Sequence, residues 1–147
     1  MADVKAAMTY DFLPADIDIL ARTVFGEARG EDYEGMKAVA HVILNRWKST
    51  KGQFARDDTI ATACLRHKQL SAWNMGDPNM AAMIATGLNN ARFRLCTRAA
   101  LEAFDEPDFT KGALHYHTVE MGWPAPWGTE HEPCYINDGH VFYNNVK

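Results

Sequence analysis

The stretch ARTVFGEARGEDYEGMKAVAHVILNR, residues 21–46, decides how the first half of the chain folds. Apolar residues recur at i, i+3, i+4 and i+7 on both sides of GEARGED, and this spacing predicts two amphipathic helices. The first helix begins at Pro14 and ends at Gly30, because glycine takes the left-handed conformation without penalty. Asp32 is placed to cap the second helix. Since the connection is short, we expect the two helices to pack as neighbours.

The rest of the chain divides into a helical part and an aromatic part. We expect a short helix through DTIATACLRH, capped by Asp57 or Asp58, and one long helix over residues 79–104. After Pro107 the chain is rich in Gly, Pro, Trp, Tyr and His, and ALHYHTV (113–119) and GHVFYN (139–144) are typical of strands. The predicted fold class is mainly α (α+β). It is a single domain over residues 1–147, with its core at about 15–145 and a small strand- and loop-rich C-terminal portion.

Composition narrows the class of protein. A chain of 147 residues with 47% apolar residues can bury one core. The net charge of −4, without any basic block, argues against a nucleic-acid binder. The first fifteen residues lack the apolar run of a signal peptide, and no segment has membrane-spanning length. We therefore expect synthesis in the cytoplasm and no membrane insertion.

The three cysteines, Cys64, Cys96 and Cys134, are odd in number and widely spaced. They suit buried thiols better than a disulfide framework or a metal knuckle. A single Cys64–Cys96 disulfide remains an alternative.

Glu27 is the strongest candidate for chemistry. It lies in the last turn of the first helix, at the border of the buried stripe, where partial burial and the negative end of the helix dipole both raise the pKa of a carboxyl group. A carboxylic acid that stays protonated near neutral pH can protonate the leaving oxygen of a glycosidic bond. The alternative is an ordinary solvated charge paired with Arg29. Glu31, beyond Gly30, is expected to be a charge near the positive end of the second helix.

Residues 21–46 closely resemble the opening motif of the cell wall hydrolase family typified by spore cortex-lytic enzymes. KQLSAW (68–73) is similar to that family's Gln-aromatic-Ser-x-Trp block, with Leu70 where Phe is common. GALHYH (112–117), PAPW (124–127) and GHVFY (139–143) resemble the remaining blocks in the same order. The resemblance runs from about Leu20 to Tyr143.

The resemblance implies a lysozyme-like α-rich fold that cleaves the glycan strands of peptidoglycan. The family's catalytic acid falls on Glu27. By analogy with lytic transglycosylases, it would protonate the oxygen between N-acetylmuramic acid and N-acetylglucosamine. It would then act as base on the muramic C6 hydroxyl, giving a 1,6-anhydro product. This mechanism requires no cofactor, metal or second carboxylate; whether the enzyme transfers or hydrolyses, as a muramidase does, stays open.

Several side chains are candidates for binding the glycan. Gln69 and Ser71 offer hydrogen bonds to sugar hydroxyl and acetamido groups, and Trp73 offers a flat face for a pyranose ring. The alternative for this block is a loop anchored by a buried tryptophan. Other candidates for the wall of the site are Tyr116, Tyr143 and His115, with His140 as a second histidine that would orient backbone or substrate. Trp123 and Trp127 would either cover the glycan or close the core.

Two rival functions belong to other classes. His115 and His117, two apart on a strand, point to one face, and with His131, Cys134 and His140 they suggest a zinc-dependent N-acetylmuramoyl-L-alanine amidase. Against this, the sequence has no HExxH and no paired CxxC. The second rival is a non-catalytic wall-binding module that uses the Trp and Tyr cluster.

The expected setting is that of a phage or prophage endolysin. We expect a monomer that reaches peptidoglycan in the periplasm after a holin, a separate membrane protein, has permeabilised the inner membrane.

Overall fold

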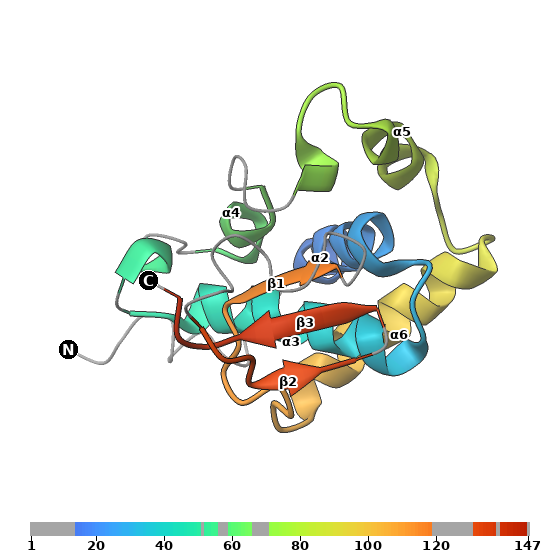
Figure 1. Ribbon diagram of the computed structural model, residues 1–147. Coiled ribbons are helices and arrows are strands. Elements are labelled where there is room, and N and C mark those ends of the chain that lie inside the picture. Colours follow the sequence, from blue (N-terminus) through green and yellow to red (C-terminus); the bar gives the residue numbers. More distant parts are fainter. Residues whose placement is uncertain are drawn as a thin grey trace.

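The computed structural model describes residues 14–50, 52–55, 59–65, 71–118, 131–137 and 139–146. Three helices form the body: α2 (Pro14–Ala28), α3 (Tyr33–Lys48) and α6 (Ala91–Asp105), each packed against the other two. A small antiparallel sheet lies along α3, and α4 and α5 lie beside α2 (Figure 1). No helix among the described residues is long and apolar enough to cross a membrane.

The predicted helix pair around GEARGED is confirmed. Asp32 caps α3, and its carboxylate accepts a hydrogen bond of 2.8 Å from the backbone N–H of Gly35. The reason given for the end of α2 is wrong, because Gly30 is not among the described glycines with positive φ. The helix ends at Ala28 instead, where the N–H of Glu31 closes a turn on the Ala28 carbonyl at 3.0 Å.

The predicted long helix over residues 79–104 is wrong: α5 (Pro78–Ala85) and α6 are separate helices. Asn90 caps α6 by accepting a hydrogen bond of 3.0 Å from the N–H of Phe93. The guanidinium of Arg22, on α2, donates to the carbonyls of Met83 and Thr86, both at 2.7 Å. These contacts satisfy the end of α5 and turn the chain, so tertiary contacts override a continuous helical pattern.

Short elements connect the body. They are η1 (Gly52–Phe54), α4 (Ile60–Leu65) and η2 (Ser71–Trp73). α4 confirms the predicted short helix, whereas its proposed caps, Asp57 and Asp58, lie outside the described residues. The last three residues of the KQLSAW block form the 3₁₀ turn η2.

The sheet has the order β1-β3-β2, with β1 (His115–Thr118), β2 (Tyr135–Ile136) and β3 (His140–Tyr143). β1 and β3 confirm the predicted strands, while β2 is too short to show an alternation. Tyr116 pairs with Phe142 and His115 with Tyr143. Since side chains alternate along a strand, Tyr116 and Phe142 share one face and His115 and Tyr143 share the other.

The core contains side chains from all three large helices and from β3. Cys64 and Cys96 are buried within it, and all three cysteines are free thiols. The alternative of a Cys64–Cys96 disulfide is therefore wrong, and the prediction of buried thiols is confirmed for this pair.

Candidate active site

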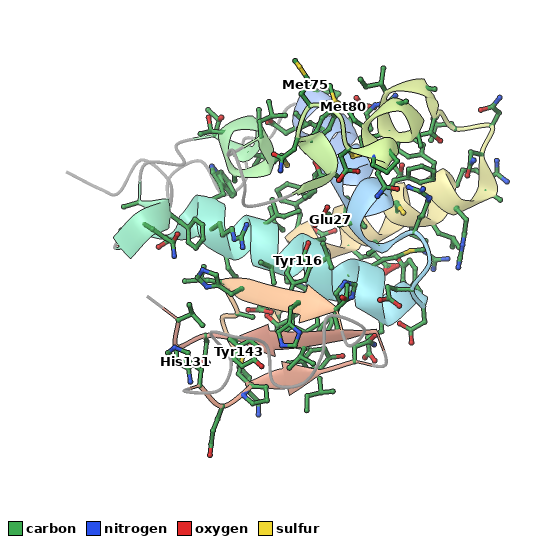
Figure 2. The ribbon with its side chains drawn as sticks, turned by 45° about the horizontal axis from the view of Figure 1, so that its top comes forward. Glu27, Met75, Met80, Tyr116, His131 and Tyr143 are labelled. Atoms are coloured by element: carbon green, nitrogen blue, oxygen red, sulfur yellow. The ribbon has the colours of Figure 1, made fainter. Side chains whose placement is uncertain are left out.

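Three segments far apart in the sequence meet at the carboxylate of Glu27. Figure 2 shows Glu27 with Tyr116 beside it. Glu27 lies half-buried in the last turn of α2. Its Oε1 accepts a hydrogen bond of 2.6 Å from the hydroxyl of Tyr116 on β1. Its Oε2 accepts a hydrogen bond of 3.1 Å from the backbone N–H of Ala72 in η2. The side chain is therefore held at both oxygens.

The surroundings raise the pKa of Glu27 above its ordinary value, mainly because burial disfavours the charged form. The hydrogen bonds from Tyr116 and Ala72 act in the opposite direction. Among the nearby charges, Asp77 raises the pKa and Arg46 lowers it. The predicted direction is confirmed, and so is burial, one of the two causes given for it; the helix dipole is not among the causes found.

Trp73 anchors η2 on α2. Its indole N–H donates a hydrogen bond of 2.8 Å to Oγ1 of Thr23, and its ring is partly buried against the core. This contact is the one expected if the KQLSAW block is a loop anchored by a buried tryptophan. Stacking of the ring on a sugar stays a prediction.

Gly26 lets η2 and α5 approach α2 closely. A Cβ at this position would overlap Met83 of α5 and would come within 2.9 Å of the Cβ of Ala72. The N-terminal end of α5 is fixed as well, because Arg29 donates a hydrogen bond of 2.7 Å to the side chain of Asn79. η2, which carries the Ala72 N–H, and α5 are thus held against α2, which carries Glu27.

Arg46 is a buried cation that the sequence analysis did not select. Its Nε donates a hydrogen bond of 2.8 Å to the carbonyl of Leu114, and its guanidinium lies 4.5 Å from the ring centroid of Phe54. Its positive charge favours the ionised forms of both Glu27 and Tyr116. A signal was present, since Arg46 follows Val39 and Ile43 at the i, i+4, i+7 spacing of the buried stripe of α3.

The structure places Tyr116 at Glu27 and Tyr143 elsewhere. Tyr143 is 1% exposed, lies on the opposite face of the sheet, and its hydroxyl is 3.0 Å from Nε2 of His117. His115 packs its ring on Phe54 at 5.3 Å, and its Nε2 lies 3.1 Å from the amide nitrogen of Gln53. Burial, followed by the charge of Arg46, lowers the pKa of His115 to about 4.

Other candidates fall outside the described part of the chain. Gln69, Trp123 and Trp127 are not described, nor is the side chain of Ser71.

The histidines of the zinc interpretation have separate partners. His117 bonds to Tyr143 and to the backbone carbonyl of Thr118, whereas His115 contacts η1. Within the described ranges, no group of three or more His, Cys, Asp or Glu side chains is placed to hold a metal ion.

Comparison with known proteins agrees with this architecture. The family model described as Cell Wall Hydrolase matches residues 30–143. The chain belongs to this family. The match begins just after Glu27, so the assignment of that residue depends on the local motif and the geometry described above.

Relatives and solved structures point in the same direction. A spore cortex-lytic enzyme from Oceanobacillus iheyensis is 65% identical over 115 residues, which are 74% of this chain and 35% of that protein. The chain thus spans about a third of the length of that relative. The catalytic domain of the Bacillus cereus SleB protein has a TM-score of 0.71 at 26% identity, over 90% of this chain and 92% of that one. The catalytic domain of the germination-specific lytic transglycosylase SleB from Bacillus anthracis has a TM-score of 0.70 at 26% identity, over 92% and 98%. These matches confirm the family resemblance and the predicted lysozyme-like, mainly helical fold.

Proposed function

We propose that the protein cleaves the glycan strands of peptidoglycan between N-acetylmuramic acid and N-acetylglucosamine, with Glu27 as general acid and then general base. The observation that carries the proposal is the Glu27 carboxyl group, which has a raised pKa and is held at both oxygens by Tyr116 and Ala72. The family of wall hydrolases and the SleB domains named above supply the class of substrate.

The chemistry follows from the two protonation states of Glu27. In the first step the carboxylic acid gives its proton to the glycosidic oxygen, the bond to muramic C1 breaks, and the N-acetylglucosamine end leaves as an alcohol. In the second step the carboxylate takes the proton of the C6 hydroxyl while O6 bonds to C1, which gives the 1,6-anhydro end and restores the acid. Between the steps Glu27 is ionised, and the Tyr116 hydroxyl, the Ala72 N–H and the charge of Arg46 stabilise it.

Hydrolysis is the second candidate, and Asp77 is the observation that favours it. Hydrolytic glycosidases use a second carboxylate to activate water or to form a covalent intermediate. Asp77 acts electrostatically on Glu27, so it is the second carboxylate to consider. Its Oδ1 accepts a hydrogen bond of 2.8 Å from the N–H of Asn79 as the cap of α5, so one of its two oxygens already has a structural partner.

The products distinguish the routes. Purified peptidoglycan is incubated with wild type, with Glu27→Gln and with Glu132→Gln, a control at an exposed position, and the fragments are analysed by mass spectrometry. We expect anhydromuramic ends from wild type and Glu132→Gln, and none from Glu27→Gln. Reducing ends lost on Asp77→Asn would establish the hydrolase. Freed stem peptides on intact glycan would overturn the proposal in favour of the amidase, and wall binding without cleavage would favour the binding module.

The biological role is proposed separately. The sequence predicts that the protein is a phage-type endolysin, which acts as a monomer on the periplasmic wall and depends on a holin for release. Expression with and without a holin, followed by culture turbidity, tests it. Lysis only when both are present supports the role, and lysis by this protein alone contradicts it.

A further inference from the structure

We infer that Glu31, the second carboxylate of the GEARGE motif, forms with His140 a positioning pair that holds Tyr116 on Glu27. The inference rests on the proposed function of Glu27, and it gives Glu31 a task beyond that of a charge at the start of a helix.

The pair joins the helical motif to the sheet. Oε1 of Glu31, in the turn between α2 and α3, lies 2.9 Å from Nδ1 of His140, the first residue of β3. The two atoms are in contact, but the N–H direction does not meet the angle of a hydrogen bond, and the contact is an ion pair only when His140 is protonated. Side-chain exposure is 2% for His140 and 22% for Glu31, so solvent only weakly screens the interaction between the Glu31 carboxylate and the dipole of the His140 ring.

The turn before β3 is shaped to admit the Glu31 carboxylate. A Cβ on Gly139 would overlap that carboxylate, so only glycine leaves room for it. The same turn is fastened to the start of α3, since Nδ2 of Asn137 donates a hydrogen bond of 3.2 Å to Oδ1 of Asp32. The Glu31–His140 contact is therefore part of a docked turn.

His140 in turn contacts the ring of Tyr116 and restricts its position. The two rings meet edge to face, with centroids 5.1 Å apart and planes at 83°. Phe142 lies against the Tyr116 ring at 5.6 Å. The Tyr116 ring is thus confined by two rings of β3, and its hydroxyl reaches Glu27 at 2.6 Å. Displacing His140 removes one of these restraints, and misplacement of a catalytic group by about 1 Å costs up to about 100-fold in rate.

The charged groups around Glu27 and around His140 determine how pH should affect activity. Glu27 is faced by Tyr116 from β1, Arg46 from α3 and Asp77 at the cap of α5. The hydrogen bond from Tyr116 lowers the pKa of Glu27. If the Tyr116 hydroxyl moves away and this bond is lost, the pKa of Glu27 rises further. The activity of a general acid falls as pH rises through its pKa, and the alkaline limb of the pH profile would therefore move to higher pH.

His140 itself is faced by Glu31, His117 and Tyr116. Burial, followed by His117, lowers the pKa of His140 to about 4. A neutral ring still presents a nitrogen dipole to Glu31, so the pair does not require a charged histidine.

The test breaks the contact from three sides. Glu31→Gln removes the charge, Gly139→Ala displaces the carboxylate while keeping its charge, and His140→Phe keeps a ring without nitrogen. For each variant, kcat and KM on soluble peptidoglycan fragments are measured across pH, with thermal unfolding beside them. Each change is also made together with Tyr116→Phe. Glu106→Gln is the matched control, because it breaks an ion pair of 2.6 Å with Lys37.

We expect kcat to fall about 10-fold with KM nearly unchanged, and the alkaline limb to move to higher pH. In the Tyr116→Phe background the same changes should have little further effect, since residues that act through one group are not additive. Unchanged kcat and pH profile in the variants that fold, or effects that add to Tyr116→Phe, would overturn the inference. If Glu27→Gln abolishes cleavage while Glu31→Gln does not alter it, the proposed function stands and the pair fails. An active Glu27→Gln means instead that the proposed function has failed.

Discussion

Gly26→Ala tests whether the close contact of α2 with η2 sustains activity. The new methyl would overlap the side chain of Met83, which is fully buried, and would lie 2.9 Å from the Cβ of Ala72. Met83 is flexible, whereas Ala72 is displaced only if the backbone of η2 moves. That movement withdraws the N–H that Oε2 of Glu27 accepts at 3.1 Å.

The two consequences have different sizes. Overpacking costs about 1–3 kcal/mol, and replacing glycine inside a helix by alanine returns about 1 kcal/mol. We therefore expect a net loss of stability of up to about 2 kcal/mol, which lowers the unfolding temperature by up to about 8 °C. A hydrogen bond to a charged group contributes about 1.5–3 kcal/mol, so its loss lowers kcat by roughly 10- to 100-fold.

Gly30→Ala is the matched control, because a Cβ there meets nothing within 4 Å and the φ of Gly30 is not positive. Thermal unfolding and release of glycan fragments are measured for both variants. Equal activity and stability for Gly26→Ala and Gly30→Ala would refute the reasoning. The double variant Gly26→Ala with Met83→Ala separates the obstacles: full recovery of activity would mean that Met83, rather than Ala72, transmits the effect.

Three further predictions follow from burial and charge. Because the folded pKa of Glu27 is raised, its contribution to stability is present below the ordinary glutamate pKa and is lost as pH rises through the folded value. The stability of Glu27→Gln relative to wild type should therefore increase with pH, measured by thermal unfolding from acid to alkaline buffer; a constant difference would contradict this. Arg46→Met leaves the Leu114 carbonyl without its donor and should cost about 1–3 kcal/mol of stability. Arg46→Met should also move the alkaline limb of the pH–activity profile to higher pH, because Arg46 lowers the pKa of Glu27. An unchanged alkaline limb would contradict this effect of Arg46 on Glu27. Since Cys64 and Cys96 are free and buried, reductant should leave the unfolding temperature unchanged, whereas a fall would indicate a disulfide.

The sequence predicted the elements that depend on local patterns. The apolar stripes of α2 and α3, the Asp32 cap and the two longer strands need only short-range spacing, and all of them are confirmed. The break between α5 and α6 has one local signal that was missed, the Asn90 cap, and one distant contact, the hydrogen bonds of Arg22, about which periodicity carries no information. β2 has two residues, a single period of the strand alternation, so it contains no repeat that could be detected in the sequence.

In the candidate site, too, some features were predictable from local sequence and others depend on the three-dimensional fold. The border position of Glu27 on its helix was visible in the sequence, and so was the direction of its pKa shift. Its partners were not separable, because Tyr116 and Tyr143 have similar surroundings in sequence and only the register of β1 with β3 places them on opposite faces. Arg46 carried a signal in its buried register, but a charged residue in a stripe is usually read as solvated.

In the proposed mechanism Glu27 acts twice, and the opposing influences on its pKa fit that mechanism. Burial and Asp77 favour the protonated form, which the first step of the proposed mechanism needs, while Tyr116, Ala72 and Arg46 favour the ionised form, which its second step needs. A purely apolar pocket would hold the proton too firmly for the carboxylate to form, and an exposed glutamate would be ionised before the first step. Rate at one pH then depends on keeping these influences in balance. This is a physical reason for the sheet to be docked on the helical motif at two points, with Tyr116 on Glu27 and His140 on Glu31.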